Sequence, residues 1–169
     1  MKKAKGFTLV ELVVVIAIIG VLAAILVPTM LNYVRKAKLK AANTNAKTAY
    51  NAVQEFFTEQ MATKGLGIDD VLTQYGRKVV DCNIPPKSNL TPAQKAVHDV
   101  LAVNGISSGH VWVDKATIAG VDDVVYVQWT GDHNADGNSE AVIGQYPDAI
   151  SWDTYRSGNN AWKTYVAPA

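Results

Sequence analysis

Five oxygen-bearing side chains lie close together in the C-terminal third of the chain, at a spacing that suits a cation. They are Asp132, Asn134, Asp136, Asn138 and Glu140. Calcium takes about six to eight oxygen ligands, and Gly137 would let such a loop turn sharply. The pattern matches only the first half of an EF-hand loop, because Ile143 stands where the bidentate glutamate belongs. A polar turn between strands uses the same residue types, so structural Ca2+ and a plain turn both stay open.

No set of residues in the sequence points to catalysis. His98, His110 and His133 fall in separate segments and form no zinc or acid–base motif. The sequence also shows no glycine-rich phosphate loop, nucleophile elbow or catalytic carboxylate pair. We therefore expect a protein that is not an enzyme, with no cofactor apart from the calcium ion considered above.

A single acid, Glu11, interrupts an apolar segment near the N-terminus. A lysine-rich leader, residues 1–6, ends at Gly6, and Phe7 opens the apolar segment. A carboxylate is costly inside a membrane, so a sequence that retains one usually provides a partner for it. The simpler alternative is that Glu11 only stabilises the positive end of a helix.

The residues that follow form a charge-free run, Leu12–Leu31. At 1.5 Å per residue, this run spans about 30 Å, the thickness of the hydrocarbon core of a bilayer. A secretory signal is one alternative, but its apolar region is typically about 7–15 residues long. An ordinary single-span anchor is another. Gly20 and Pro28 interrupt the run, and the proline predicts a kink.

Beyond the apolar run, the helical pattern becomes amphipathic. One stripe of residues recurs at intervals of three and four, and all but the last are apolar or small: Ala42, Ala46, Ala49, Val53, Phe56 and Gln60. Gly65 ends the pattern. We expect one helix with a membrane-spanning part, residues 7–34, and an amphipathic part, residues 35–64, whose apolar face packs on a head of residues 65–169.

The head combines short helices with strands, which predicts an α+β fold. Helices are expected at 69–75 and 92–103, and strands at 110–114, 124–130 and 140–146. The strands suggest an antiparallel β-meander packed on the amphipathic part of the long helix. The tail, residues 152–166, would add an edge strand or wrap the sheet.

Charge differs along the chain. The 169 residues carry a formal net charge of +1, and the head from Gly65 onward has 7 basic and 12 acidic residues, leaving −5. An acidic head argues against nucleic acid as a direct partner. The basic cluster at residues 35–40 suits anionic lipid headgroups or acidic groups of a neighbouring copy. Its positive charge nearly equals that of the leader lysines on the other side of the apolar run. The positive-inside rule therefore does not decide the orientation of the chain in a membrane.

The only cysteine is Cys82, which excludes an internal disulfide and is expected to be buried and unreactive. Four tryptophans occur. Trp112 and Trp129 lie in predicted strands and are assigned to the core. Trp152 and Trp162 lie in the polar tail, where they would either stack on sugars or hold the tail down.

The run Lys5–Glu11 and the charge-free span after it resemble the N-terminus of the type IV pilin family, which includes the pseudopilins of type II secretion and DNA-uptake systems. The resemblance covers residues 2–31. It implies that a prepilin peptidase/methyltransferase cuts after Gly6 and methylates the new N-terminus, Phe7. It also implies that Glu11 meets the N-terminal amine of a neighbouring subunit as a filament grows.

The family further implies a membrane-to-filament life cycle. The chain would be a single-pass protein of the cytoplasmic membrane, pass through an inner-membrane pilus assembly platform, and join a helical homo-oligomeric filament on the cell surface for adhesion or motility. Within that filament the helix would loosen near Gly20 and Pro28. A pseudopilin whose filament stays in the envelope is the alternative, and a membrane-tethered binding protein or adhesin is a third. Many Gram-negative members clamp the C-terminal region with a disulfide, and this chain departs from that pattern.

Overall fold

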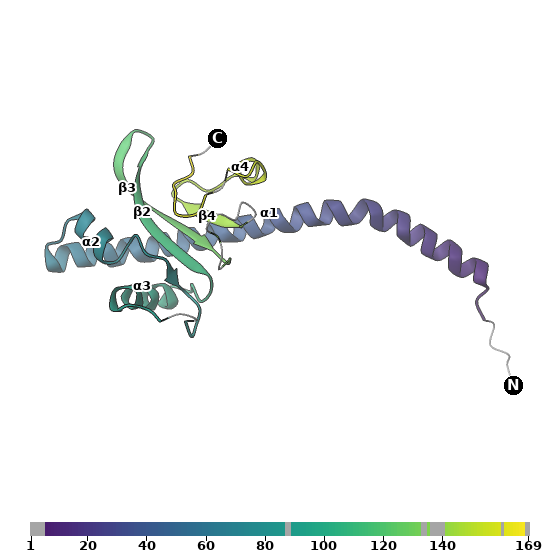
Figure 1. The fold of residues 1–169 in the computed structure, drawn as a ribbon, viewed down its shortest axis with the longest axis horizontal. Coiled ribbons are helices and arrows are strands. Elements are labelled where there is room, and N and C mark those ends of the chain that lie inside the picture. Colours follow the sequence, from purple (N-terminus) through teal and green to yellow (C-terminus); the bar gives the residue numbers. More distant parts are fainter. Residues whose placement is uncertain (1–5, 87–88, 133–134, 136–140, 160, 168–169) are drawn as a thin grey trace. The chain divides into compact units, whose positions relative to one another are not determined.

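The chain divides into two units, residues 1–37 and 38–169. The computed structural model describes residues 6–86, 89–132, 135, 141–159 and 161–167 (Figure 1). The elements are α1 (Leu9–Lys64), α2 (Ile68–Gln74), β1 (Val80–Asp81), α3 (Pro92–Val103), β2 (His110–Ile118), β3 (Val121–Thr130), β4 (Ile143–Tyr146) and α4 (Trp152–Arg156). A long helix and a four-stranded antiparallel sheet confirm the predicted α+β class.

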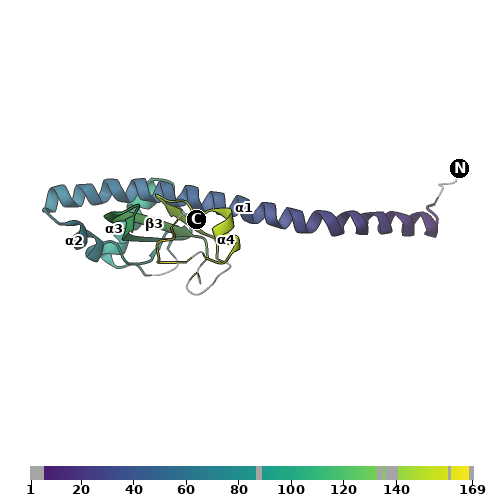
Figure 2. The ribbon, with the colours of Figure 1, turned by 90° about the horizontal axis from the view of Figure 1, so that it is seen from above.

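Helix α1 belongs to both units, and its side chains differ between them. In the first unit its residues are exposed. In the second unit, small side chains form a buried stripe that lets the helix approach the sheet closely: Ala42, Ala46, Ala49 and Ala52. Val53 and Phe57 continue the stripe, and Figure 2 shows this part of α1 running along the sheet. The predicted amphipathic pattern is therefore confirmed, with Phe57 rather than Phe56 as the buried aromatic residue.

The sheet has the order β1-β2-β3-β4, and every neighbouring pair is antiparallel. The predicted meander is confirmed, but its strand limits were wrong. Strand β2 continues to Ile118 and β3 begins at Val121, because the two strands pair with each other along this arm. Strand β4 begins at Ile143 rather than at residue 140, since its pairing with β3 starts there. The two-residue strand β1 was not predicted.

The main core lies between α1, α2, α3 and the sheet, with Phe57, Leu72, Leu101 and Val111 among its fully buried side chains. Helix α3 has the predicted bounds. The amide of Gln94 donates to Thr91 Oγ1 at 3.3 Å, and the Thr91 amide donates back to Gln94 Oε1 at 2.9 Å, which closes a capping box.

A second, smaller cluster forms where α1 meets β4 and the tail. It buries Leu39, Ile143 and Ile150, and Trp152 and Trp162 pack against it. The described part of the tail contains α4 and no strand, so the expectation of an edge strand was wrong and the wrapping alternative is the one observed. The reason is that side chains of the sheet, rather than a neighbouring strand, satisfy the backbone of the tail.

Candidate functional site: the N-terminal segment and the clamped head

Glu11 lies in a closed hydrogen-bonded unit with Thr8 at the start of α1. The Thr8 amide donates to Glu11 Oε2 at 2.8 Å, and the Thr8 hydroxyl donates to the same oxygen at 2.6 Å. The Glu11 amide donates to Thr8 Oγ1 at 3.3 Å. This is a capping box, and it explains why α1 begins at Leu9 rather than at Phe7. The signal for Thr8 was present in the sequence as a threonine three residues before a glutamate, directly ahead of an apolar run.

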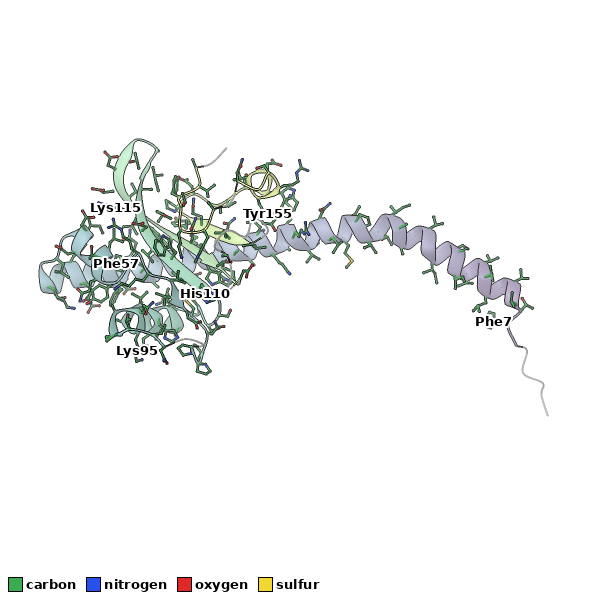
Figure 3. All side chains as sticks on the ribbon, in the orientation of Figure 1. Phe7, Phe57, Lys95, His110, Lys115 and Tyr155 are labelled. Atoms are coloured by element: carbon green, nitrogen blue, oxygen red, sulfur yellow. The ribbon has the colours of Figure 1, made fainter. Side chains whose placement is uncertain are left out.

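The apolar part of α1 exposes almost its whole surface. Phe7 (labelled in Figure 3) is 87% exposed, and Leu9, Val21 and Met30 each exceed 60%. By length and composition, α1 is the one helix of the described chain that is long and apolar enough to cross a membrane. An exposed apolar surface of this extent marks a region that lipid or other chains can cover.

Gly20 and Pro28 both lie inside α1, which continues through them. The Thr29 hydroxyl donates to the carbonyl of Leu26 at 2.9 Å, one turn back, beside the proline. This is the local bond that threonine commonly makes inside helices. The carbonyl that loses its ladder donor because of Pro28 is a different one, that of Ala24, four residues before the proline. Loosening of this stretch within a filament concerns the assembled state, and it stays a prediction.

The predicted calcium loop falls largely outside the described residues. This applies to Asn134, Asp136, Asn138 and Glu140, as it does to His133. Asp132 is described, and its amide donates to Thr130 Oγ1 at 3.1 Å. Among the described residues, no group of three or more His, Cys, Asp or Glu side chains is placed to hold a metal ion. Structural Ca2+ at this loop stays a prediction.

Two buried glutamines on neighbouring strands hold the C-terminal tail. Gln128 Nε2 donates to the carbonyls of Ala161 at 2.8 Å and Thr164 at 2.7 Å, and its Oε1 accepts the Lys163 amide at 2.7 Å. Gln145 continues the arrangement. Its Nε2 donates to the Val166 carbonyl at 2.8 Å and its Oε1 accepts the Val166 amide at 2.9 Å. We call Gln128 and Gln145 the glutamine clamp.

The two clamp residues also contact each other, since Gln128 Nε2 lies 3.1 Å from Gln145 Oε1. Both side chains are fully buried, so each polar atom needs these partners. The clamp fixes the tail to the sheet through side-chain hydrogen bonds alone. Sequence reasoning missed it, because two glutamines in strands carry no local signal.

Asn43 on α1 provides a second connection that the sequence did not predict. Its Oδ1 accepts the amides of Gln145 at 3.0 Å and Ile150 at 3.2 Å, and its Nδ2 donates to the Ile150 carbonyl at 2.9 Å. The helix therefore completes the hydrogen bonds of the edge strand β4. Gly144 permits this approach, because a Cβ there would overlap the backbone of Ala42.

Two further side chains have perturbed acidity in the head. Burial raises the pKa of the Cys82 thiol to about 12, which agrees with the predicted unreactive cysteine. Burial, and then the hydrogen bond to Asp148, raises the pKa of Tyr165 to about 12. Both groups therefore stay neutral at physiological pH.

The remaining predicted residues do not form a common site. His98 packs beside Asn83 and Asp99, with its Nδ1 3.0 Å from Asp99 Oδ1, while His110 is buried in β2. Trp112 and Trp129 are half-buried in strands, and the Trp129 indole donates to the Ser108 carbonyl at 3.0 Å. Trp152 and Trp162 are half-buried against the second cluster, which favours packing of the tail over sugar stacking.

Comparison with known proteins shows which proteins the N-terminal segment is similar to. The family model described as "Prokaryotic N-terminal methylation motif" matches residues 1–27. The type IV major pilin protein PilA of Myxococcus xanthus (strain DK1622) is 46% identical over 56 residues, which cover 33% of this chain and 26% of that protein. The type IV wide pilus major component PilA4 of Thermus thermophilus is 54% identical over 50 residues, covering 30% and 34%. The N-terminal segment of this chain is therefore similar to that of type IV pilins.

The likeness to pilins extends beyond the apolar helix in some relatives. The fimbrial protein of Moraxella nonliquefaciens is 37% identical over 86 residues, which cover 47% of this chain and 56% of that protein. The matches thus span between about a quarter and a little over half of the length of these curated relatives. No solved structure matches the chain.

Proposed function

We propose that this chain is the major-type structural subunit of a type IV pilus. A prepilin peptidase/methyltransferase removes residues 1–6 and methylates Phe7, and the processed chain polymerises through α1 into an extracellular filament for adhesion or motility. The observation that carries the proposal is the charge-free, exposed half of α1, most of which lies within the matched N-terminal motif.

The exposed helix accounts for both stages of this life cycle. Before assembly, lipid covers the apolar side chains of a single-pass protein in the cytoplasmic membrane. After assembly, the same side chains are covered by the helices of neighbouring copies. This keeps them out of water, where their exposure would cost roughly 25 cal/mol per Å² of apolar area. The inner-membrane pilus assembly platform would move the subunit from one environment to the other.

Glu11 supplies the specific step. Cleavage after Gly6 would create a charged amine at Phe7, four residues before the carboxylate of Glu11. Two charges that are costly in lipid separately become tolerable as a pair. The capping box with Thr8 holds the carboxylate at the helix start in the free chain, so a neighbouring amine would meet an oriented partner.

Intact mass and N-terminal sequence of protein sheared from the cell surface test the proposal. A chain that starts at Phe7, is heavier by roughly 14 mass units for one methyl group, and sediments with filaments would support it. A processed chain found only in membranes would indicate a pseudopilin instead. An unprocessed chain that starts at Met1 would overturn the proposal and leave a membrane-tethered binding protein.

A further inference from the structure

A groove of about 380 Å³ runs between α1 and α3 on the head. Its floor is apolar, with Ala52 and Phe56 from α1 and Val100 from α3. Val103, at the end of α3, lines the same groove and is 88% exposed. An exposed valine over an apolar floor marks a surface that another group can cover.

Two carboxylates border this groove on α1, one turn apart. Glu55 and Glu59 both line it, and the neighbouring hollow along α1 shares them. Asp99, across the groove on α3, pairs with Lys95 at 2.8 Å. Within the described chain, Glu55 and Glu59 form no ion pair with a cation. Like charges four residues apart on a helix repel each other, so this pair gains from a partner.

The same helix carries a stripe of matching spacing and opposite charge. Lys36 and Lys40 are exposed and one turn apart, and in the part of the chain that the structure describes neither has an acidic partner. Tyr33, on the same face, is 75% exposed. Ala37 completes this face. The stripe therefore offers two cations and one large aromatic ring.

The two stripes correspond position by position at a constant separation of 19 residues. The charged pairs are Lys36 with Glu55 and Lys40 with Glu59, and both are of opposite sign. Between them, the small Ala37 corresponds to the larger, half-buried Phe56. Tyr33 corresponds to Ala52, which is 1% exposed, so the ring would lie at the edge of the groove and not on that alanine. Such correspondence over two turns favours contact between parallel copies of one helix, where residues match at a fixed offset.

We infer that the groove edged by Glu55 and Glu59 receives the Tyr33–Lys40 turn of a second copy of this chain, shifted along the helix axis by about 28 Å, the rise of 19 residues. The inference rests on the proposed filament function and names the contact by which neighbouring copies set their register.

This contact cannot close on itself. It joins different surfaces of two identical chains, which makes it heterologous. Each contact also adds the same axial shift, so successive copies advance along an axis instead of returning to the first. Heterologous contacts that do not close produce open helical filaments.

Charge exchange in the full-length protein tests the contact in cells that assemble filaments. The double variant E55K/E59K and the double variant K36E/K40E should each lower the yield of sheared filaments at least tenfold, because like charges would then face each other. The quadruple variant restores opposite charges and should return the yield to within about twofold of the original. The control D122K/D153K makes the same change in net charge as E55K/E59K, at exposed sites outside the groove, and should assemble normally.

Cross-linking measures the register directly. Lys40→Cys combined with Glu59→Cys should give a ladder of multimers with a short bismaleimide in intact filaments. In the control pair Thr44→Cys with Glu59→Cys, the first cysteine lies one helical turn, about 5.4 Å, further along the helix. The yield of cross-linked multimers should then be at least about tenfold lower. Cys82 is buried and does not compete for the reagent.

The outcomes separate this contact from the proposed function. Normal filaments without the Lys40–Glu59 ladder would overturn the contact and leave the pilin proposal intact. Loss of filaments in K36E/K40E that the glutamate reversals do not rescue would also overturn it, and would assign the lysines to anionic lipid headgroups. Failure of the unaltered chain to form filaments would refute the proposed function, and the contact with it.

Discussion

The glutamine clamp allows a quantitative test of how a pilin head without a disulfide holds its C-terminal tail. The perturbation is Gln128→Met, which keeps the length of the side chain and removes its amide. An amide group carries two N–H protons, so the bonds to Ala161 and Thr164, at 2.8 and 2.7 Å, are its main donor bonds. The Lys163 amide supplies the third bond between Gln128 and the tail, at 2.7 Å.

The expected magnitude follows from these three bonds. A hydrogen bond within a protein contributes about 1 kcal/mol net, so their loss should weaken docking of the tail by about 3 kcal/mol. That free energy corresponds to roughly a hundredfold increase in the population of the open tail. The tail can meet water once it opens, so the effect should be local and the head should stay folded.

Hydrogen exchange of the full-length chain in detergent measures this opening. In Gln128→Met, exchange of the Lys163 amide should rise roughly a hundredfold. The Cys82 amide, bound to the Gly109 carbonyl at 2.9 Å, serves as an internal reference that should not change. Gln54→Met is the matched control, because the side-chain amide of Gln54 bonds only to the Tyr50 hydroxyl in the described contacts.

Unchanged exchange at Lys163 would refute the reasoning and assign the tail to aromatic packing by Trp162 and Tyr165. A double-mutant cycle adds a second criterion. Gln128 and Gln145 contact each other at 3.1 Å, so their effects should not be additive. Strict additivity would mean that the two amides act as separate anchors.

Three further predictions concern the helix start, the contact between helix and sheet, and the buried thiol. Glu11→Gln retains a hydrogen-bond acceptor for Thr8 but loses the charge, so we expect a processed membrane protein without filaments. The control Thr8→Val keeps the charge of Glu11 and should still assemble. Normal filaments from Glu11→Gln would contradict the charge pairing. Gly144→Ala should lower the free energy of unfolding by about 1–3 kcal/mol, because its Cβ would overlap the backbone of Ala42; an unchanged urea midpoint would exclude this contact. Burial raises the pKa of Cys82 from 9.0 to about 12. The buried neutral thiol therefore contributes fully to the free energy of unfolding below pH 9, and this contribution is lost as the pH rises through 12. If the free energy of unfolding fell equally with pH in the unaltered chain and in Cys82→Ala, the prediction would be contradicted.

Local patterns account for the parts of the fold that the sequence predicted well. Helix α3 starts and ends at the predicted residues because its signals lie next to each other in the chain: a threonine cap, a proline in the first turn and a glycine beyond the end. The length of α1 followed from continuous helical periodicity up to Lys64. The arm formed by β2 and β3 was predicted too short, because cross-strand pairing extends both strands through residues of weak strand propensity.

The sequence by itself determined the resemblance to type IV pilins and the apolar half of the long helix. A leader, a lone acid and a charge-free run are contiguous, and their meaning depends on composition and spacing along a single helix. Only the tertiary structure decided how the head is closed. Asn43 reaches Ile150 across 107 positions, and Gln128 reaches Thr164 across 36. Such bonds form between residues that the fold brings together, so no pattern of neighbours along the chain announces them.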